Sequence, residues 1–182
     1  MLDNAFGWIG QIIEWFGRFI PRWEILDTTE GAIKYKRGKT PIFCGPGIHW
    51  WWPAVSKFVS FPIARQTTSL PTQTIVTADN KVVAISGLIV YRVEDLMKLL
   101  PTTYQPDQAI GEIALTAVHR VCCRLTWEEL TLRQRMGTLG TRLRKAAQRE
   151  LEDYGVRIIK VQLTDLAPAR VFKLIQTTSV DG

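Results

Sequence analysis

The sequence contains no uninterrupted apolar run of the ~20 residues that a membrane-spanning helix requires. It also lacks the basic start of a cleavable signal peptide, because Asp3 stands near the N-terminus and Glu14 interrupts the first apolar stretch. Cysteine is scarce, and Cys44, Cys122 and Cys123 show no disulfide-framework spacing. We therefore expect a reducing compartment or cytoplasmic exposure.

Motifs for common catalytic chemistry are missing as well. There is no glycine-rich phosphate loop and no nucleophile elbow. His119 and Cys123 lie four residues apart on one expected helical face, but a zinc site needs about four ligands. The other candidates, Cys44 and His49, have no ligand-type spacing. The sequence predicts no cofactor, no metal site and no enzymatic activity.

Residues 5–20, "AFGWIGQIIEWFGRFI", form an amphipathic pattern at helical spacing. A helix of this length spans roughly 24 Å, which is short of the ~30 Å hydrocarbon core. Two interpretations remain open, a helix lying in a membrane interface and a helix packed on the domain's own core. We predict the membrane interface. The predicted membrane-binding residues are Trp8, Ile9, Ile12, Ile13, Trp15, Phe16, Phe19 and Ile20.

The segment "CGPGIHWWWP", residues 44–53, places Trp50, Trp51 and Trp52 in succession on what reads as a turn. Neighbouring side chains on an extended chain point to opposite faces, so the three cannot all enter one core. We therefore expect some of this aromatic surface to contact something outside the domain. Cys44 beside it is a possible acylation site, with a buried thiol as the alternative.

The remaining pattern indicates an α+β fold, with strands before residue 95 and mostly helices after it. We expect strands at 63–70 and 73–77, and a central strand at 81–93 that is apolar on both faces and covered on both sides. Thr126 and Glu129 form a capping-box pattern. A single long helix is predicted over 131–154, with its inward side formed by Leu139, Leu143, Ala147, Leu151 and Tyr154.

The net charge of +6 is concentrated in residues 131–149, which contain six basic residues and no acidic one. Arg135, Arg142 and Arg149 recur every seven residues and so predict one stripe along a helix. A solvated face, anionic lipid and nucleic-acid phosphates are alternatives. No nucleic-acid motif accompanies the stripe. We expect no nucleic acid and favour an acidic neighbour, possibly another copy of the chain.

Five segments follow one another along the chain and together cover about residues 24–172, most of its length. They are "EGAIKYKRGK", "GPGIHWWWP", "PTQTIVTADNKVVAISGLIVYRVED", "AIGEIALTAVHRVCCRLTWEEL" and "YGVRIIKVQLTDLAPARV". Their sequences and their order resemble the SPFH or band 7 family, which includes stomatin, prohibitin and flotillin.

The resemblance implies an SPFH-like α+β domain with a β-rich first subdomain and a mixed α/β second subdomain. We predict an amphipathic helix over 1–22, the two subdomains over 23–95 and 96–168, and a C-terminal helix or tail over 169–182. Because relatives dip apolar loops of the first subdomain into the bilayer, we expect Trp50, Trp51 and Trp52 to touch the lipid interface. Indole rings favour that layer.

The resemblance also implies a non-enzymatic membrane scaffold that self-assembles laterally into a ring or cage-like oligomer and organises lipids or membrane-protein clients. The short helix favours peripheral attachment, which we expect at the cytoplasmic face. The chain stops soon after Val171, so we expect no tall cage. A flat ring, a low oligomer, and a truncated or minimal viral or bacterial version of the family remain open. The predicted oligomer interface pairs the arginine stripe with acidic residues of a neighbour, namely Glu128, Glu129, Glu150 and Glu152.

Two other functions remain possible from the sequence. One is a soluble binding module that regulates a partner protein, such as a membrane protease or channel, through the apolar helix. The other is a membrane-perturbing protein whose helix permeabilises bilayers. Lipid-dependent oligomerisation separates the scaffold from the binding module, and dye release from vesicles identifies the membrane-perturbing protein.

Overall fold

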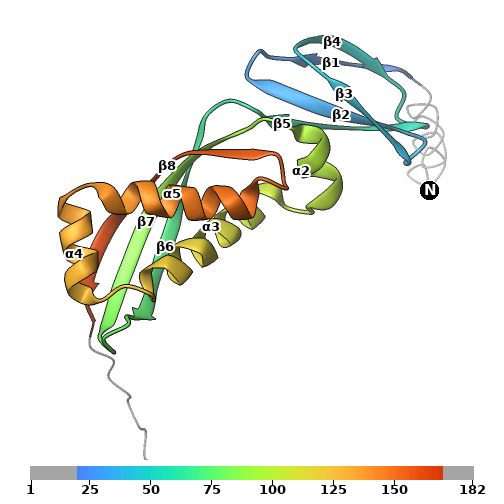
Figure 1. Ribbon diagram of the computed structural model, residues 1–182. Helices are drawn as coiled ribbons and strands as arrows, with labels where there is room; N and C mark the ends of the chain where they lie inside the picture. Colours follow the sequence, from blue (N-terminus) through green and yellow to red (C-terminus); the bar gives the residue numbers. More distant parts are fainter. Residues whose placement is uncertain (1–19, 170–182) are drawn as a thin grey trace, which may run out of the picture.

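A computed structural model describes residues 20–169, which form two lobes (Figure 1). The first lobe is all-β and has two layers. One layer is an antiparallel ribbon of β1 and β4, and the other is an antiparallel sheet in the order β3-β2-β5. The strands are β1 (Arg22–Leu26), β2 (Glu30–Lys36), β3 (Thr40–Cys44), β4 (Gly47–Trp51) and β5 (Ser56–Pro62).

Between the two layers of the first lobe lies a small apolar cluster. Leu26, Ala32 and Cys44 are buried there, and Phe58 packs against them. The opposite face of the three-stranded sheet turns to the second lobe, because Ile33 and Phe61 belong to the large core. The first lobe is therefore anchored through β2 and β5, whereas the ribbon rests on only a few side chains.

The second lobe is an antiparallel sheet in the order β6-β7-β8, with four helices (Figure 1). The predicted boundaries place β6 and β7 in the β-rich subdomain, but both strands share a sheet with β8 of the α/β part, and β7 pairs with β8 directly. The elements are β6 (Gln66–Val76), β7 (Val82–Val93), α2 (Leu96–Thr102), α3 (Pro106–Cys122), α4 (Trp127–Arg135), α5 (Thr138–Leu151) and β8 (Val156–Pro168).

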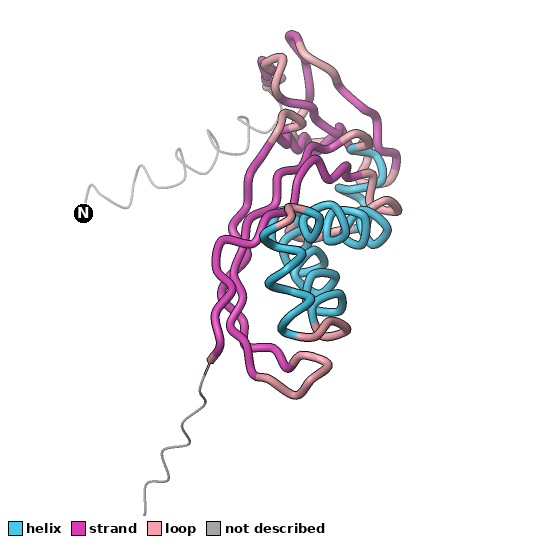
Figure 2. The backbone as a smooth tube through the Cα atoms, turned by 60° about the vertical axis from the view of Figure 1, so that its left-hand side comes forward, coloured by secondary structure: helices cyan, strands magenta, loops and turns pink. Residues whose placement is uncertain are grey.

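Helices cover one face of this sheet (Figure 2). Burial along β7 alternates accordingly: Val83, Ile85 and Ile89 are buried, whereas Ala84 and Leu88 on the other face are partly exposed. The expectation that β7 is covered on both sides is therefore wrong for the part of the chain that the structure describes. The apolar residues on the second face of β7 favoured a two-sided strand, but the described residues cover only one side.

The predicted helix over 131–154 is in fact two helices, α4 and α5. Gly137 adopts a left-handed backbone with φ 70°, which an L-residue helix cannot accommodate. The predicted inward residues of α5 are nevertheless correct, because Leu139, Leu143, Ala147 and Leu151 are fully buried. Tyr154 is only partly buried and follows the helix.

Two strands were predicted over 63–70 and 73–77, but the structure has the single strand β6. Its pairing with β7 shifts register between Leu70 and Gln73. Pro71 lies at this irregularity. A proline cannot donate a ladder hydrogen bond, so it interrupts the pairing without ending the strand.

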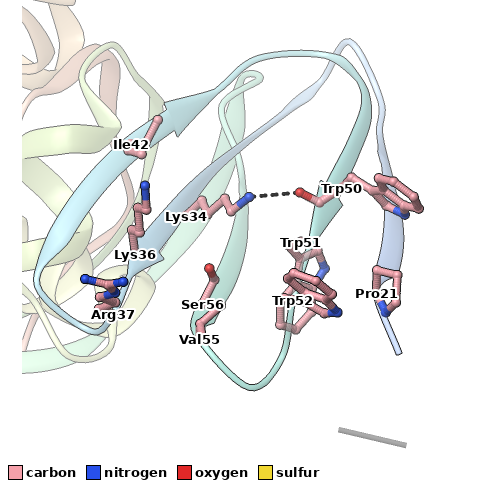
Figure 3. A pocket seen from close by; sticks show the side chains of 10 residues that line it. All are labelled: Pro21, Lys34, Lys36, Arg37, Ile42, Trp50, Trp51, Trp52, Val55 and Ser56. Atoms are coloured by element: carbon pink, nitrogen blue, oxygen red, sulfur yellow. Dashed lines mark hydrogen bonds between the residues drawn. The ribbon is translucent and has the colours of Figure 1, made fainter. Parts of the chain in front are cut away.

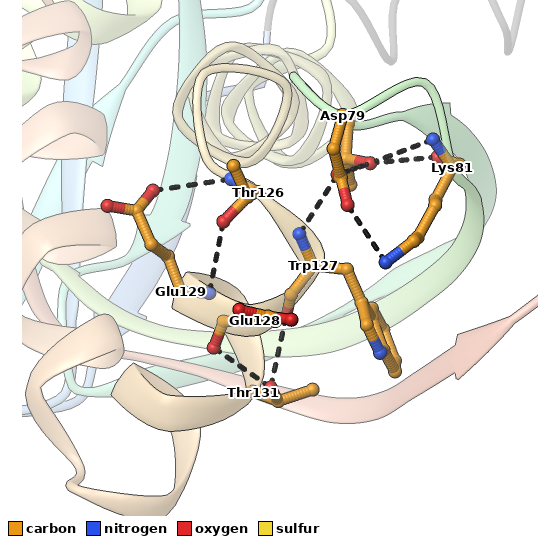
Figure 4. A network of polar contacts seen from close by, with 8 residues as sticks. Asp79, Lys81, Thr126, Trp127, Glu128, Glu129 and Thr131 are labelled. Atoms are coloured by element: carbon orange, nitrogen blue, oxygen red, sulfur yellow. Dashed lines mark hydrogen bonds and ion pairs between the residues drawn. The ribbon is translucent and has the colours of Figure 1, made fainter.

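The turn between β6 and β7 is tied to the start of α4 (Figure 4). The Asp79 carboxylate accepts hydrogen bonds from the Thr77 hydroxyl at 2.6 Å and the Trp127 backbone N–H at 3.0 Å. The Lys81 ammonium lies 3.1 Å from the same carboxylate. The bond from Thr77, followed by those from Lys81 and Trp127, lowers the pKa of Asp79 to about 2.

The first turn of α4 carries the predicted capping box. The Thr126 hydroxyl accepts from the backbone N–H of Glu129, and the Glu129 carboxylate accepts from the backbone N–H of Thr126, each at 3.3 Å (Figure 4). These bonds satisfy helix-start N–H groups that have no partner within the helix. One acidic residue of the predicted oligomer interface therefore has a structural role inside its own chain.

Candidate membrane-binding surface

The outer face of the β1–β4 ribbon is apolar and exposed. The register pairs Trp23 with Trp50 and Ile25 with Ile48. Their exposed fractions are 69% and 57% for the tryptophans and 72% and 68% for the isoleucines. The two indole rings lie 4.9 Å apart. Two adjacent cross-strand pairs of this size form a continuous apolar surface of the kind that marks an interaction site.

The three consecutive tryptophans point in different directions. Trp50 and Trp51 belong to β4, so the prediction that all three lie on a turn is wrong, although Trp52 follows the strand directly. Trp51 points inward, where its ring stacks on Phe58 at 6.0 Å and its indole N–H donates to Glu24 at 3.4 Å. Trp52 is 54% exposed. Strand alternation explains the separation of Trp50 from Trp51.

A groove of about 560 Å³ opens beside the exposed apolar face, at the edge of the first lobe (Figure 3). It combines aromatic and cationic side chains. The Lys34 ammonium donates a hydrogen bond to the backbone carbonyl of Trp50 at 2.9 Å, which bridges the sheet and the ribbon. The lining residues are Pro21, Lys34, Lys36, Arg37, Ile42, Trp50, Trp51, Trp52, Val55 and Ser56.

The hairpin turn between β2 and β3 forms part of this groove. Arg37 and Gly38 both have left-handed backbones, with φ 53° and 69°. Two successive residues of this kind are typical of the tight turns that join antiparallel strands. The turn is fixed by the Arg37 backbone N–H, which donates to the carbonyl of Val55 at 2.7 Å. This bond fixes the backbone of Arg37, which lines the groove.

Of the residues predicted on the amphipathic helix, Ile20 alone falls within the described part of the chain. It is 63% exposed and directly precedes Pro21, which lines the groove. The other seven, Trp8, Ile9, Ile12, Ile13, Trp15, Phe16 and Phe19, lie outside the described residues.

Cys44, the possible acylation site, is buried between the layers of the first lobe. Its exposed fraction is 7%. Burial raises the pKa of its thiol, and the nearby Lys34 opposes that effect only in part. A buried thiol that stays protonated is a poor nucleophile, so acylation at Cys44 would first require the ribbon to lift from the sheet.

The arginines predicted on one stripe lie on two helices. Arg135 ends α4, whereas Arg142 and Arg149 lie on α5. Because the helix is broken at Gly137, the seven-residue spacing does not place all three arginines on one helical face. Arg142 and Arg149 instead share a basic depression of about 360 Å³ with residues of α3, lined by Ala117, Arg120, Val121, Arg124, Arg142, Lys145, Ala146, Arg149 and Glu150.

The four predicted acidic partners occupy different environments. Glu150 pairs within its own chain with Arg120 at 2.6 Å, and Glu129 caps α4. Glu128, in the first turn of α4, and Glu152, at the end of α5, are exposed. Glu128 and Glu152 are therefore the two acids that a neighbouring chain could reach without breaking a bond described here.

His119 and Cys123 do meet at the end of α3, where the Cys123 sulfur lies 3.6 Å from the His119 Nε2. Within residues 20–169 they have no third companion of the kind that a metal site would need. The neighbouring Cys122 is buried, and burial raises the pKa of its thiol to about 12. These groups do not form a reactive set with a nucleophile, a base and an orienting residue.

Sequence reasoning missed half of the exposed apolar face and the cationic side of the groove. Trp23 and Ile25 alternate with Glu24 and Leu26 in "RWEIL", and Ile48 and Trp50 follow the same period in "GIHWW". The period-two rule identifies both outward pairs. Lys34 and Lys36 also share a face, but only the packing of the ribbon on the three-stranded sheet shows that this face meets the tryptophans.

Comparison with known proteins identifies the family. The sequence model of the SPFH domain / Band 7 family matches residues 24–179, which is most of the chain. The chain belongs to this family. The α+β fold, with its β-rich first lobe and helices in the second, agrees with that membership.

Relatives with a similar sequence include archaeal proteins. A stomatin homologue of Pyrococcus horikoshii is 24% identical over 143 residues, covering 79% of this chain and 53% of the relative. An uncharacterised protein of Methanocaldococcus jannaschii is 26% identical over 149 residues, covering 82% of this chain and 74% of the relative. An uncharacterised protein of Archaeoglobus fulgidus is 23% identical over 159 residues, with 87% and 63% covered.

Family membership suggests a membrane-associated scaffold, and the family is generally non-enzymatic. SPFH proteins are typically membrane-associated. Between residues 20 and 169, no helix combines the length and the apolar character needed to cross a bilayer.

Proposed function

We propose that the protein is a non-enzymatic scaffold that attaches peripherally to a membrane, at its cytoplasmic face, and assembles laterally into a ring or other oligomer. Through that assembly it organises lipids or membrane-protein clients. The observation that carries the proposal is the paired apolar face of the β1–β4 ribbon, with Trp23 against Trp50 and Ile25 against Ile48, exposed on a lobe whose family is typically membrane-associated.

The energetics support attachment through this face. Apolar surface withdrawn from water contributes roughly 25 cal/mol per Å². Four large side chains that are each more than half exposed can therefore contribute several kcal/mol when they enter an interface. Indole rings gain further because their N–H groups remain near polar headgroups. Ile20, which is 63% exposed, and Pro21 lead directly into β1 of this surface.

The basic depression between α3 and α5 supports lateral assembly. Five of its lining residues are cationic, and its one acidic residue, Glu150, is paired with Arg120. An uncompensated positive depression favours an acidic surface. In the assembly we propose, Arg142 and Arg149 contact Glu128 or Glu152 of a neighbouring chain.

The decisive test is liposome flotation with electron microscopy of the floated fraction. The variants are the intact chain, a chain lacking residues 1–19, and Trp23→Ser with Trp50→Ser. We expect the intact chain to float and to form rings or arrays. Deletion of residues 1–19 and substitution of the two tryptophans should each weaken flotation. The two changes together should abolish it.

A matched control is Leu132→Ser with Met136→Ser. These side chains are also exposed, at 55% and 67%, but lie on the second lobe at the end of α4. The control should float like the intact chain. If the intact chain stays at the bottom as a monomer in every lipid mixture, the apolar face is a protein-binding surface and the scaffold proposal fails. Release of trapped dye would instead indicate membrane perturbation.

A further inference from the structure

We propose that the groove between the ribbon and the three-stranded sheet of the first lobe binds the phosphate headgroup of an anionic phospholipid. This inference rests on the proposed function, because it names the lipid chemistry that the membrane-facing lobe recognises. The site consists of a cationic wall and an aromatic wall facing each other (Figure 3).

The cationic wall comes from one strand and its turn. Lys34 and Lys36 are two residues apart on β2, so their side chains share a face, and Arg37 follows in the turn. Among the residues that the structure describes, no aspartate or glutamate lines the groove. Three cations without a carboxylate among them are complementary to an anion, and lysine and arginine are the usual phosphate-binding side chains.

Lys34 is already positioned for this role. Its ammonium lies 2.9 Å from the Trp50 carbonyl, so one of its three donor protons is directed at the protein. The same bond holds the cation against the aromatic wall. An anion bound here would receive donors whose positions are set by the strand and by the fixed turn at Arg37.

The aromatic wall decides between a free anion and an amphiphile. This wall is formed by Trp50, Trp51 and Trp52, and Ile42 and Val55 add further apolar surface to the groove lining. A soluble phosphate would use only the cationic wall and leave this apolar surface in water. A purely apolar ligand would cover the cations without giving them a partner, which costs free energy. A phospholipid satisfies both walls, with its phosphate against the cations and its glycerol and upper acyl region against the rings.

The position of the groove fits a ligand that stays in the bilayer. Trp50 lines the groove and also forms the exposed pair with Trp23, so the groove opens beside the surface that would enter the membrane. The basic depression on α3 and α5 makes a useful contrast. It is more cationic, but within residues 20–169 no aromatic residue lines it, so it suits a charged protein surface rather than a lipid.

The test compares vesicles of phosphatidylcholine alone with vesicles that also contain phosphatidylglycerol. The groove variant is Lys36→Gln with Arg37→Asn, because asparagine tolerates the left-handed backbone of residue 37. The matched control is Lys39→Gln with Lys57→Gln, which removes the same charge from the same lobe outside the groove lining. Lys34 is left unchanged because it holds the ribbon.

We expect phosphatidylglycerol to increase the flotation of the intact chain, with an increase that salt suppresses. In the groove variant, binding to the vesicles that contain phosphatidylglycerol should be weaker by roughly tenfold or more, because each basic residue near an anionic surface strengthens binding severalfold. The control should keep most of the increase. Brominated phosphatidylglycerol should quench tryptophan fluorescence in the intact chain more strongly than in the groove variant.

The outcomes distinguish a failure of the lipid-binding site from a failure of the proposed scaffold function. Equal flotation with both vesicle types overturns the anionic site but leaves the scaffold standing, whereas no flotation with either removes both. If the control loses as much as the groove variant, attraction is diffuse and the groove is not a site. If glycerol phosphate in solution displaces the chain from vesicles at matched concentration, the ligand is a soluble phosphate ester and the lipid assignment fails.

Discussion

In the second lobe, Leu139 and Leu143 of α5 are fully buried, whereas in the first lobe the larger side chains of Trp23 and Trp50 are more than half exposed. The same contrast extends to the cores. Among the described residues, one continuous cluster fills the second lobe and takes in Ile33 and Phe61 of the first, whereas a separate cluster of just Leu26, Ala32 and Cys44 is buried between the layers of the first lobe. The core of the second lobe therefore provides most of the stability of the fold, whereas the first lobe exposes large apolar side chains on its outer surface.

The largest effect should come from the second lobe's core. Leu143→Ala leaves a cavity between α5 and the sheet and should lower the free energy of unfolding by about 2–5 kcal/mol. The control is Leu132→Ala, whose side chain is 55% exposed on α4 and should cost less than about 1 kcal/mol. Urea denaturation measures both. Equal losses would contradict the division of roles between buried and exposed leucines.

A second prediction makes the same comparison of a buried and an exposed side chain with two adjacent tryptophans of the first lobe. Trp51→Ala removes the ring stacked on Phe58 and should cost about 1–3 kcal/mol of unfolding free energy. Trp50→Ala should cost less than about 1 kcal/mol but reduce vesicle flotation. Denaturation and flotation on the same two variants give the result. If Trp50→Ala destabilises the protein as much as Trp51→Ala, the outer face is structural.

The third prediction concerns pH at the joint of β6, β7 and α4. The folded pKa of Asp79, about 2, is below its ordinary value of 3.8. Its carboxylate therefore stabilises the fold above pH ~4, and this stabilisation is lost as the pH falls through 4 toward 2. Asp79→Asn should be less stable at neutral pH and should flatten the acid slope of the unfolding free energy.

The control for this prediction is Glu94→Gln. Hydrogen bonds from Arg92 and then Arg157 lower the pKa of Glu94 as well, but this exposed group does not join the turn to α4. Glu94→Gln should leave the acid slope closer to that of the intact protein. An unchanged slope in Asp79→Asn would remove Asp79 from the acid response.

The smallest effect is expected at the ion pair between α3 and α5. Arg120 and Glu150 lie 2.6 Å apart, but their side chains are 51% and 40% exposed. Solvent screening limits the coupling of such pairs to about 0–1 kcal/mol. A double-mutant cycle with Arg120→Gln and Glu150→Gln measures it. A coupling well above 1 kcal/mol would mean that this surface contributes to fold stability as the core does.

Much of the fold was predictable because its signals are local. The capping box at Thr126 and the buried positions of α5 were predicted correctly from residue type and spacing. The break at Gly137 was missed, because an isolated glycine within a helical pattern is often tolerated and its left-handed backbone is not visible in the pattern. The single helix and the single arginine stripe were both wrong for that one reason.

The candidate site was harder to predict because it depends on register. Alternation alone implies that Trp50 and Trp51 point apart, which the structure bears out. The partners of Trp50 could not be deduced, since Trp23 and Lys34 lie 27 and 16 residues earlier and meet it only through strand pairing and layer packing. Long-range pairing of this kind leaves no signature in a local window of sequence.

Within residues 20–169, the ribbon of β1 and β4 has no hydrogen-bonded ladder to another strand, because its two strands form a sheet of their own. Its attachment depends on Leu26, on the stacked ring of Trp51, and on the bond from Lys34 to the Trp50 carbonyl. Amide hydrogens of the ribbon should therefore exchange with solvent through a low-energy local opening, well before those of β7. A layer that opens alone can adjust to a membrane while the remainder of the molecule stays folded.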